Sequence, residues 1–310
     1  MTPVQTNQPL VDDHVFLIGR PPLKQYVNFV KQLAVDSQAV DIKLLADEWR
    51  AANRHIRELE AQEAGWADKP MIGPLDLHLE SLHKQVLKDP LFQHAFQLVP
   101  ADIGMVELAR LVVFQKHINL EYVRSLRKIL ADAPSPEQIF RFCLPFDHPA
   151  PPLKWMRTHH NSYVFVSPSN DLRFLGPALL KDDQITGFPR PGVVPGVLGL
   201  FVGFGSNFLN AIHAENRLVL NNGSHRAFAL REMGITHAPC IIQRVSQREE
   251  LKAIGSSDLH RNPDLYLSHP RPSVLRDYFD PKLRKIVAVH RRLRQVAVTF
   301  EAEQTDVPAT

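Results

Sequence analysis

Six consecutive residues with side chains or backbone suited to binding an anion lie between an apolar run and a helical pattern. They are Asn221, Asn222, Gly223, Ser224, His225 and Arg226. The amides that open a helix have no intrahelical partner and favour a negative charge. An arginine offers a forked donor that fits phosphate or carboxylate, and a glycine lets a ligand approach the backbone. We therefore expect residues 221–226 to bind an anionic small molecule, with an ordinary strand–helix turn as the alternative.

The flanking residues predict the elements that would hold this turn. Residues 218–220 form a short apolar run typical of a buried strand. Residues 226–233 have helical spacing, and Gly234 stands where a helix-ending glycine is expected. Residues 239–245 are again apolar. The sequence thus predicts a strand, a tight polar turn, a helix and a second strand.

A carboxylate inside an apolar segment is the candidate acid or base. Residues 105–114 predict a strand, on which Glu107 would share a face with Met105 and Ala109. Apolar surroundings raise the pKa of a carboxyl group and suit it to general acid–base work. The alternative is that Glu107 lies on a solvent-exposed sheet edge.

Residues 223–226, Gly-Ser-His-Arg, resemble the Gly-x-His-Arg turn of the ParB/sulfiredoxin-like superfamily, in which the turn cradles phosphates. Residues 106–130, a strand followed by a polar turn and a helix, resemble another part of the same pattern. The resemblance implies a mixed sheet in which the strand of Glu107 lies beside the Gly223 turn. Ser224 occupies the position of the reactive cysteine of sulfiredoxins, which argues against sulfiredoxin chemistry. Gln115 and Lys116 stand where the related serine kinases carry an acid, which argues against kinase activity.

Three classes of function remain open. We favour a small-molecule biosynthetic enzyme, because the layout is also faintly similar to the bacterial β-carboline-forming Pictet–Spenglerases. That resemblance implies condensation of an aromatic amino acid with an aldehyde, with Glu107 as acid and base and with Asn222 and Ser224 holding the substrate. The second class is a nucleotide-dependent phosphotransferase or a CTP or ATP switch. The third is a DNA- or protein-binding module that uses the basic segment 282–294, although no helix-turn-helix pattern follows the ParB-like unit, where partition proteins carry one.

The composition limits the kinds of partner and ligand that the chain is expected to bind. Its 310 residues are 44% hydrophobic and 22% charged with a net charge of +3, so no general polycation points to nucleic acid. Two cysteines form neither a disulfide framework nor a metal cluster. The fifteen histidines lack metal-ligand spacing: His159 and His160 are adjacent, and His78 and His83 are five apart. We expect no metal and no cofactor. Neither a signal peptide nor a membrane-spanning run is evident, so we expect a cytoplasmic protein, which could form a homodimer.

The pattern along the chain predicts an α/β protein. Residues 1–100 contain several helical patterns and are expected to form a helical N-terminal region. Residues 101–300 are expected to form the ParB/sulfiredoxin-like α/β domain, with inserted loops at about 133–215. Within these, residues 181–205 are rich in glycine and proline, which is typical of a lid or binding loop. Residues 301–310 are expected to form a loose tail.

Overall fold

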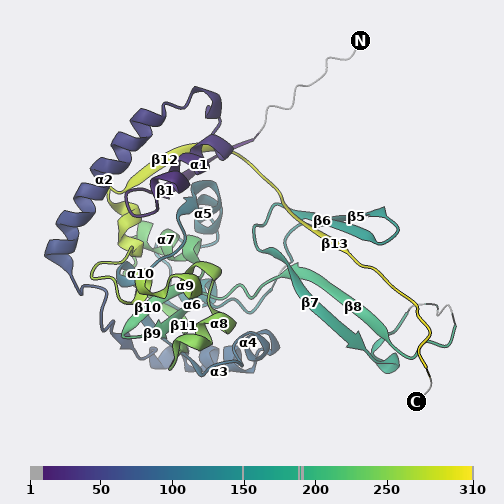
Figure 1. The fold of residues 1–310 in the computed structure, drawn as a ribbon. Helices are drawn as coiled ribbons and strands as arrows, with labels where there is room; N and C mark the ends of the chain where they lie inside the picture. Colours follow the sequence, from purple (N-terminus) through teal and green to yellow (C-terminus); the bar gives the residue numbers. More distant parts are fainter. Residues whose placement is uncertain (1–9, 149, 188, 190–191, 309–310) are drawn as a thin grey trace, which may run out of the picture. The chain divides into compact units, whose positions relative to one another are not determined.

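The computed structural model describes residues 10–148, 150–187, 189 and 192–308, and it has a mixed α/β fold (Figure 1). The predicted α/β class is therefore confirmed. As far as the chain is described, it forms two compact units. Unit 1 contains the residues up to 147 and residues 207–291, and unit 2 contains residues 148–206 and those from 292 onward. Residue 100 is thus not a boundary between units, and the middle of the predicted insertion forms unit 2 together with residues from 292 onward.

Unit 1 carries most of the regular structure. Its helices are α1 (Leu23–Leu33), α2 (Ile42–Glu63), α3 (Glu80–Lys88), α4 (Pro90–Ala95), α5 (Leu120–Arg127), α6 (Pro136–Cys143), α7 (Ser224–Glu232), α8 (Leu251–Ile254), α9 (Ser257–Arg261) and α10 (Pro263–Leu267). Its strands are β1 (Val11–Leu17), β2 (Ile72–Gly73), β3 (Ala101–Glu107), β4 (His117–Asn119), β9 (Asn210–Ala214), β10 (Arg217–Asn222), β11 (His237–Arg244) and β12 (Arg284–His290).

A five-stranded sheet with the order β10-β9-β11-β3-β2 lies at the centre of unit 1. Its strands are apolar on both faces, as expected for a sheet covered on both sides. On β10, Leu218 and Leu220 belong to one buried cluster together with Phe228 of α7. Val219 points the other way, into a second cluster with Leu259 of α9. The sheet therefore separates two apolar cores and places α7 on one of them.

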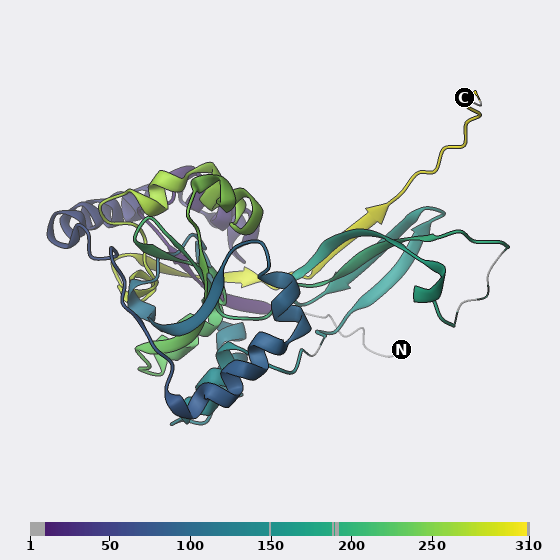
Figure 2. The ribbon, with the colours of Figure 1, turned by 90° about the horizontal axis from the view of Figure 1, so that it is seen from below.

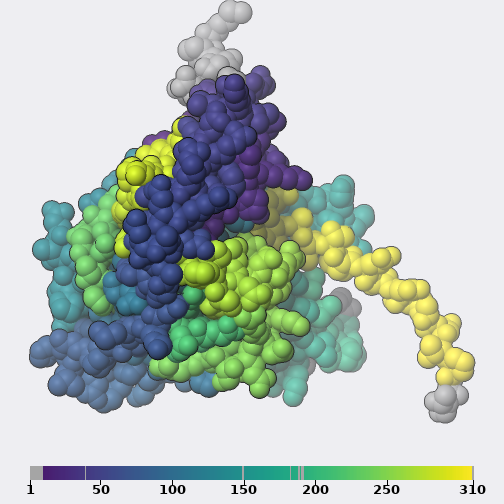
Figure 3. Space-filling model, turned by 60° about the vertical axis from the view of Figure 1, so that its left-hand side comes forward, coloured from purple at the N-terminus to yellow at the C-terminus, as the bar shows by residue number. Residues whose placement is uncertain are grey.

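A second sheet of unit 1, with the order β12-β1-β4, contains the first described strand of the chain. β1 pairs with both β12 and β4 in antiparallel fashion. Phe16 of β1 packs in one apolar cluster with Tyr26 of α1 and Ile56 of α2. Figure 3 shows α2 lying along the surface of unit 1 beside residues of the C-terminal part of the chain. The expected helices of residues 1–100 are present, but β1 and α2 share a sheet and an apolar cluster with β12, so this region is not a unit of its own.

The single strand predicted at residues 105–114 is also wrong. β3 ends at Glu107, and residues 108–110 form a short 3-10 helix. The chain then reaches the free edge of β10, where Val112 donates to Leu218 O at 2.9 Å and accepts from Leu220 N at 2.8 Å. Most residues of the run are apolar because they are buried along this crossing, and apolar content alone cannot distinguish a crossing from a strand.

Unit 2 consists of two small sheets. One has the order β13-β6-β5 and contains β5 (Lys154–His159), β6 (Ser162–Ser167) and β13 (Arg294–Thr299). The other is a ribbon of two antiparallel strands, β7 (Leu172–Leu180) and β8 (Val197–Phe204), seen from a second side in Figure 2. The predicted lid loop at 181–205 is therefore wrong for residues 197–204, where six large apolar residues and two glycines form strand β8. Residues 301–308, in the predicted tail, contain no helix or strand.

Candidate functional site

The Gly223 turn has the local structure that the sequence predicts. β10 ends at Asn222, Gly223 has a φ of 91°, α7 follows, and Gly234 ends that helix with a φ of 81°. A Cβ atom at residue 223 would lie 2.6 Å from Cδ1 of Leu209. Glycine is thus required both by the left-handed backbone and by the close approach of Leu209. The N-terminus of α7 consequently carries no side-chain cap.

Replacing Gly223 by alanine is expected to lower the free energy of unfolding by about 2 kcal/mol or more, since strain in the left-handed region adds to the clash with Leu209. Gly234→Ala is the matched control, because its φ is also positive but a Cβ there would meet nothing within 4 Å. We expect it to cost only about 1 kcal/mol. Urea denaturation of both variants measures the difference, and equal losses would contradict the role of Leu209.

Several side chains of the turn form hydrogen bonds with nearby backbone groups. Asn221 Nδ2 donates to Ile254 O at 3.2 Å, and Asn222 Oδ1 accepts from Gly223 N at 2.9 Å. Arg226 is buried, donates to Asn207 O and lies 6.0 Å from the ring centre of Phe142. Ser224 is buried as well. His225 is the residue of the turn whose contacts reach another sheet.

Glu107 does not lie at the turn. It pairs with His237 on β11, whereas Asn222 pairs with Asn210, which lies opposite Ile241 on the same β11. The two sites are thus separated by four residues along the strands, about 13 Å, and by three strand intervals, about 14 Å. The expectation that the strand of Glu107 lies beside the Gly223 turn is wrong, because β9 and β11 lie between β3 and β10.

The structure instead brings two other histidines to the turn. His14 comes from β1 and His117 from β4, and their Nδ1 atoms are 3.1 Å apart. The backbone N–H of Asn119 donates to Nε2 of His225 at 3.1 Å, so the neutral imidazole of His225 carries its proton on Nδ1. The ring of Tyr122 stands edge-on to His225, 5.1 Å between centres. We call His14, His117 and His225 the histidine cluster.

All three imidazoles have pKa values below the ordinary one. Burial, aided by the nearby His117 and His14, lowers the pKa of His225 to about 3. Burial, aided by His14 and Lys116, lowers the pKa of His117 to about 4. Burial also lowers the pKa of His14, although Asp12 and Asp13 oppose this effect. Near neutral pH the cluster is therefore uncharged, with N–H donors and bare nitrogen acceptors.

Asn119 connects the cluster to an ion pair. Its Oδ1 accepts from Tyr122 N at 3.0 Å and so caps α5, while its Nδ2 donates to Oδ2 of Asp12 at 3.1 Å. Arg291 binds the same carboxylate, at 2.6 Å from Nη2 to Oδ1. Burial alone would raise the pKa of Asp12, but the hydrogen bonds from Arg291 and Asn119 hold it below its usual value. The N-termini of α5 and α7 thus meet at the cluster, and the acid beside it is already paired.

The sequence contains a partial signal for this site. His117 lies in the polar turn after residues 105–114, but nothing local connects it with His14 or His225. The described part of the chain holds no group of three or more His, Cys, Asp or Glu side chains arranged to bind a metal ion.

Several basic side chains of segment 282–294 bind other residues of unit 1. Lys285 forms an ion pair with Glu48, Arg291 with Asp12, and Arg284 Nη1 donates to Tyr278 O at 3.3 Å. These pairs hold β12 against neighbouring elements, so three of the charges that suggested a nucleic-acid surface are bound within unit 1.

No helix among the described residues is long and apolar enough to span a membrane. Comparison with protein-family models, curated proteins and solved structures finds no match to this chain. The resemblances to the ParB/sulfiredoxin-like superfamily and to the Pictet–Spenglerases therefore stay predictions.

Proposed function

We propose that the protein is an enzyme that binds an anionic, amino-acid-like small molecule at the N-terminus of α7, with the histidine cluster as its acid–base group. The observation that carries this proposal is the convergence of His14, His117 and His225 from three separate elements on that helix end. The histidine cluster replaces Glu107 as the candidate base, because the strand of Glu107 lies three strands away from β10.

The chemistry of the cluster supports an anionic ligand. The N-terminus of α7 has no side-chain cap, and helix N-termini favour negative charge. His225 has its Nε2 engaged by Asn119, which directs its remaining N–H, on Nδ1, as a donor. An uncharged imidazole donates a hydrogen bond without requiring a counter-ion, so it adds affinity for a carboxylate or phosphate without a cost for burying a charge.

The hydrogen bond between His14 and His117 supports a role in proton transfer. One Nδ1 donates to the other, so the pair holds one shared proton between two imidazoles of different pKa. Such a pair can relay a proton without a net change in charge: the imidazole that donates from Nδ1 takes a proton at its bare Nε2, the shared proton moves across, and the other imidazole releases the proton on its Nε2. The most concrete reaction remains the condensation of an aromatic amino acid with an aldehyde, which releases water and gives a tetrahydro-β-carboline, with His117 in the role first expected of Glu107. Its product would be detected by mass spectrometry, as the sum of the two substrates less water, after incubation with L-tryptophan and several aldehydes.

Substrate binding is expected to depend on His225. Isothermal titration calorimetry with L-tryptophan, ATP and CTP as separate probes would identify the class of anion. His225→Gln keeps an acceptor near the position of Nε2 but removes the Nδ1 donor, so we expect at least about a tenfold loss of affinity for the bound probe. His78→Gln is the control, because His78 is exposed and outside the cluster.

Two outcomes would overturn the proposal: no probe binds at millimolar concentration, or the His225→Gln variant binds as tightly as the unmodified protein. Binding of CTP or ATP alone would support the anion site but shift the function to a nucleotide-dependent one. We also propose a cytoplasmic location, because both cysteines are unpaired and buried, as is common in a reducing compartment.

A further inference from the structure

The β7–β8 ribbon lacks an apolar core of its own. Among the described residues of unit 2, only Ser167 and Leu172 are buried. An isolated two-stranded ribbon is at best marginally stable in water. Of the seventeen residues in β7 and β8, Arg173 alone is charged, and the others are apolar or glycine. The ribbon therefore requires other apolar residues to pack against it.

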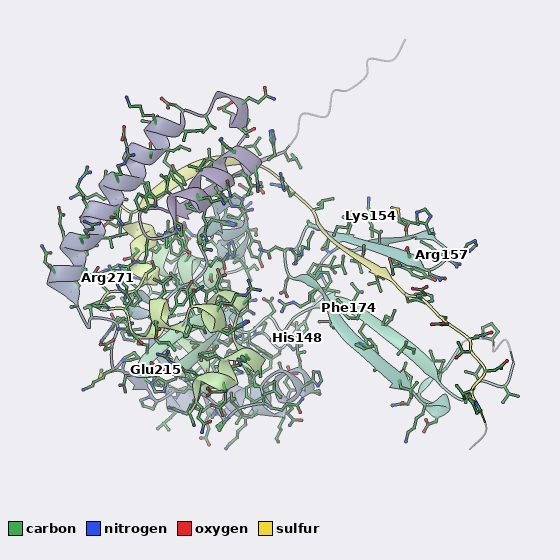
Figure 4. The ribbon with its side chains drawn as sticks, viewed as in Figure 1. His148, Lys154, Arg157, Phe174, Glu215 and Arg271 are labelled. Carbon is green, nitrogen blue, oxygen red and sulfur yellow. The ribbon has the colours of Figure 1, made fainter. Side chains whose placement is uncertain are left out.

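The strand register places a continuous row of apolar residues on one face of the ribbon. Residues directly opposite each other in an antiparallel pair point to the same side, and successive pairs alternate. One side carries four pairs of apolar residues, which we call the ribbon face: Leu172 with Phe204, Phe174 with Val202, Pro177 with Leu200, and Leu179 with Leu198. Leu179 is 77% exposed and Leu198 64%, and Figure 4 shows Phe174 on the same ribbon.

The opposite face is interrupted by glycines and carries Arg173, and its Leu175 and Phe201 are 52% and 45% exposed. A Cβ atom at Gly199 would lie 3.3 Å from the ring of Phe201, and one at Gly203 would lie 3.1 Å from Cδ1 of Leu175. These large side chains thus lie over the backbone at the glycines. The row of large apolar residues is consequently continuous on the ribbon face, whereas glycines separate the large residues of the opposite face.

We infer that the ribbon face binds the ribbon face of a second copy of this chain, in a twofold symmetric dimer. A twofold contact requires a patch that is complementary to itself. The ribbon face meets this requirement, since it holds no charge that would repel its copy and no polar group that would lose its water. Two such faces would pack as a small sandwich, like the inner faces of two sheets.

The size of the face sets the strength of this dimer. Nine residues of strand are about 30 Å long, and two strands with their side chains are about 10 Å wide. The contact would remove several hundred Å² from water, at the low end of specific interfaces, where association is weak. We therefore expect dimerisation to depend on protein concentration in the micromolar range.

The ribbon suits a second copy better than a lipid bilayer. The two strands pair only with each other, so both outer edges keep free backbone N–H and C=O groups. Unpaired backbone groups are strongly disfavoured in hydrocarbon, where open sheet edges do not occur. In a dimer these edges stay in water.

Sedimentation velocity of the full chain between about 1 and about 100 μM tests the inference. We expect a shift from 35.2 kDa towards twice this mass. Leu198→Asp places a charge on the most exposed pair of the ribbon face and is expected to weaken the dimer at least about thirtyfold, as for an interface hot spot. Leu77→Asp is the control, because Leu77 is 84% exposed but lies in unit 1.

A cross-linking variant keeps the test decisive if Leu198→Asp does not fold. Both native cysteines are buried, and burial raises the pKa of Cys143 to about 12 and also raises that of Cys240, so neither thiol is reactive. Leu179→Cys would add one accessible thiol on the ribbon face, and mild oxidation is expected to give a covalent dimer. Leu77→Cys is expected to give none.

A chain that stays monomeric at every concentration and gives no disulfide through Leu179→Cys would overturn the inference. A dimer unaffected by Leu198→Asp would also overturn it, because another surface would then form the contact. Binding to phosphatidylcholine vesicles that is abolished by Leu198→Asp would identify lipid as the partner instead. None of these outcomes depends on the ligand site at α7.

Discussion

Lowering the pH from 6.5 to about 5 is expected to reduce the free energy of unfolding by about 2 kcal/mol for each of His117 and His225. An unfolded histidine takes up a proton below pH 6.5, whereas these two stay neutral in the folded state until about pH 4 and pH 3. Between these values protonation favours the unfolded chain. The contribution to stability is therefore complete above pH 6.5 and is lost as the pH falls.

Urea denaturation at pH 7, 6 and 5 would measure this effect. The His117→Gln and His225→Gln variants are each expected to have a shallower dependence on pH than the unmodified protein, since one titrating group is absent. His78→Gln should keep the full dependence, because that side chain is exposed. The pKa of Asp12 is lowered from 3.8, so the stability that its ion pair contributes is lost at a more acidic pH. It therefore does not affect the change measured between pH 7 and 5. Equal slopes for all four proteins would show that the cluster is not buried in its neutral form.

Removing Arg271 is expected to destabilise unit 1 by about 3–5 kcal/mol. Arg271 is 3% exposed and holds Asp277 through two hydrogen bonds of 2.6 and 2.7 Å. Its Nε also donates to Glu63 at 3.1 Å, at the C-terminal end of α2 (Figure 4). Arg271→Met fills a similar volume but leaves the buried carboxylate of Asp277 with only the N–H of Val274, at 3.0 Å. The loss of stability thus comes mainly from the buried carboxylate of Asp277, which no longer has a cationic partner.

The double variant Arg271→Met, Asp277→Leu separates the charge from the packing. It removes both members of the pair, so we expect it to recover a large part of the lost stability. Arg50→Met is the control, because the pair of Arg50 and Asp47 is exposed at 58% and 57% and should contribute less than about 1 kcal/mol. Thermal and urea unfolding would measure all three. If the double variant is as unstable as Arg271→Met, the unpaired carboxylate of Asp277 is not the cause of the lost stability.

The Gly223 turn could be predicted from the sequence because its determinants are local. A glycine between an apolar run and a helical pattern specifies strand, turn and helix within a few residues, and the structure contains these elements. The long α2 was predictable for the same reason, since its apolar spacing persists over many turns. The α/β class follows from such patterns, because each depends only on neighbours along the chain.

The partners of the turn were not predictable, because they come from residues distant in sequence. His14 and His117 are 103 residues apart, and they meet because β1 pairs with β4. Glu107 lies away from the turn because the chain crosses from β3 to the far edge of β10 at Val112, which the uniform apolarity of the segment conceals. The sequence alone thus determines a glycine turn between a buried strand and a helix, whereas the pairing of distant strands determines that histidines rather than a glutamate lie beside it.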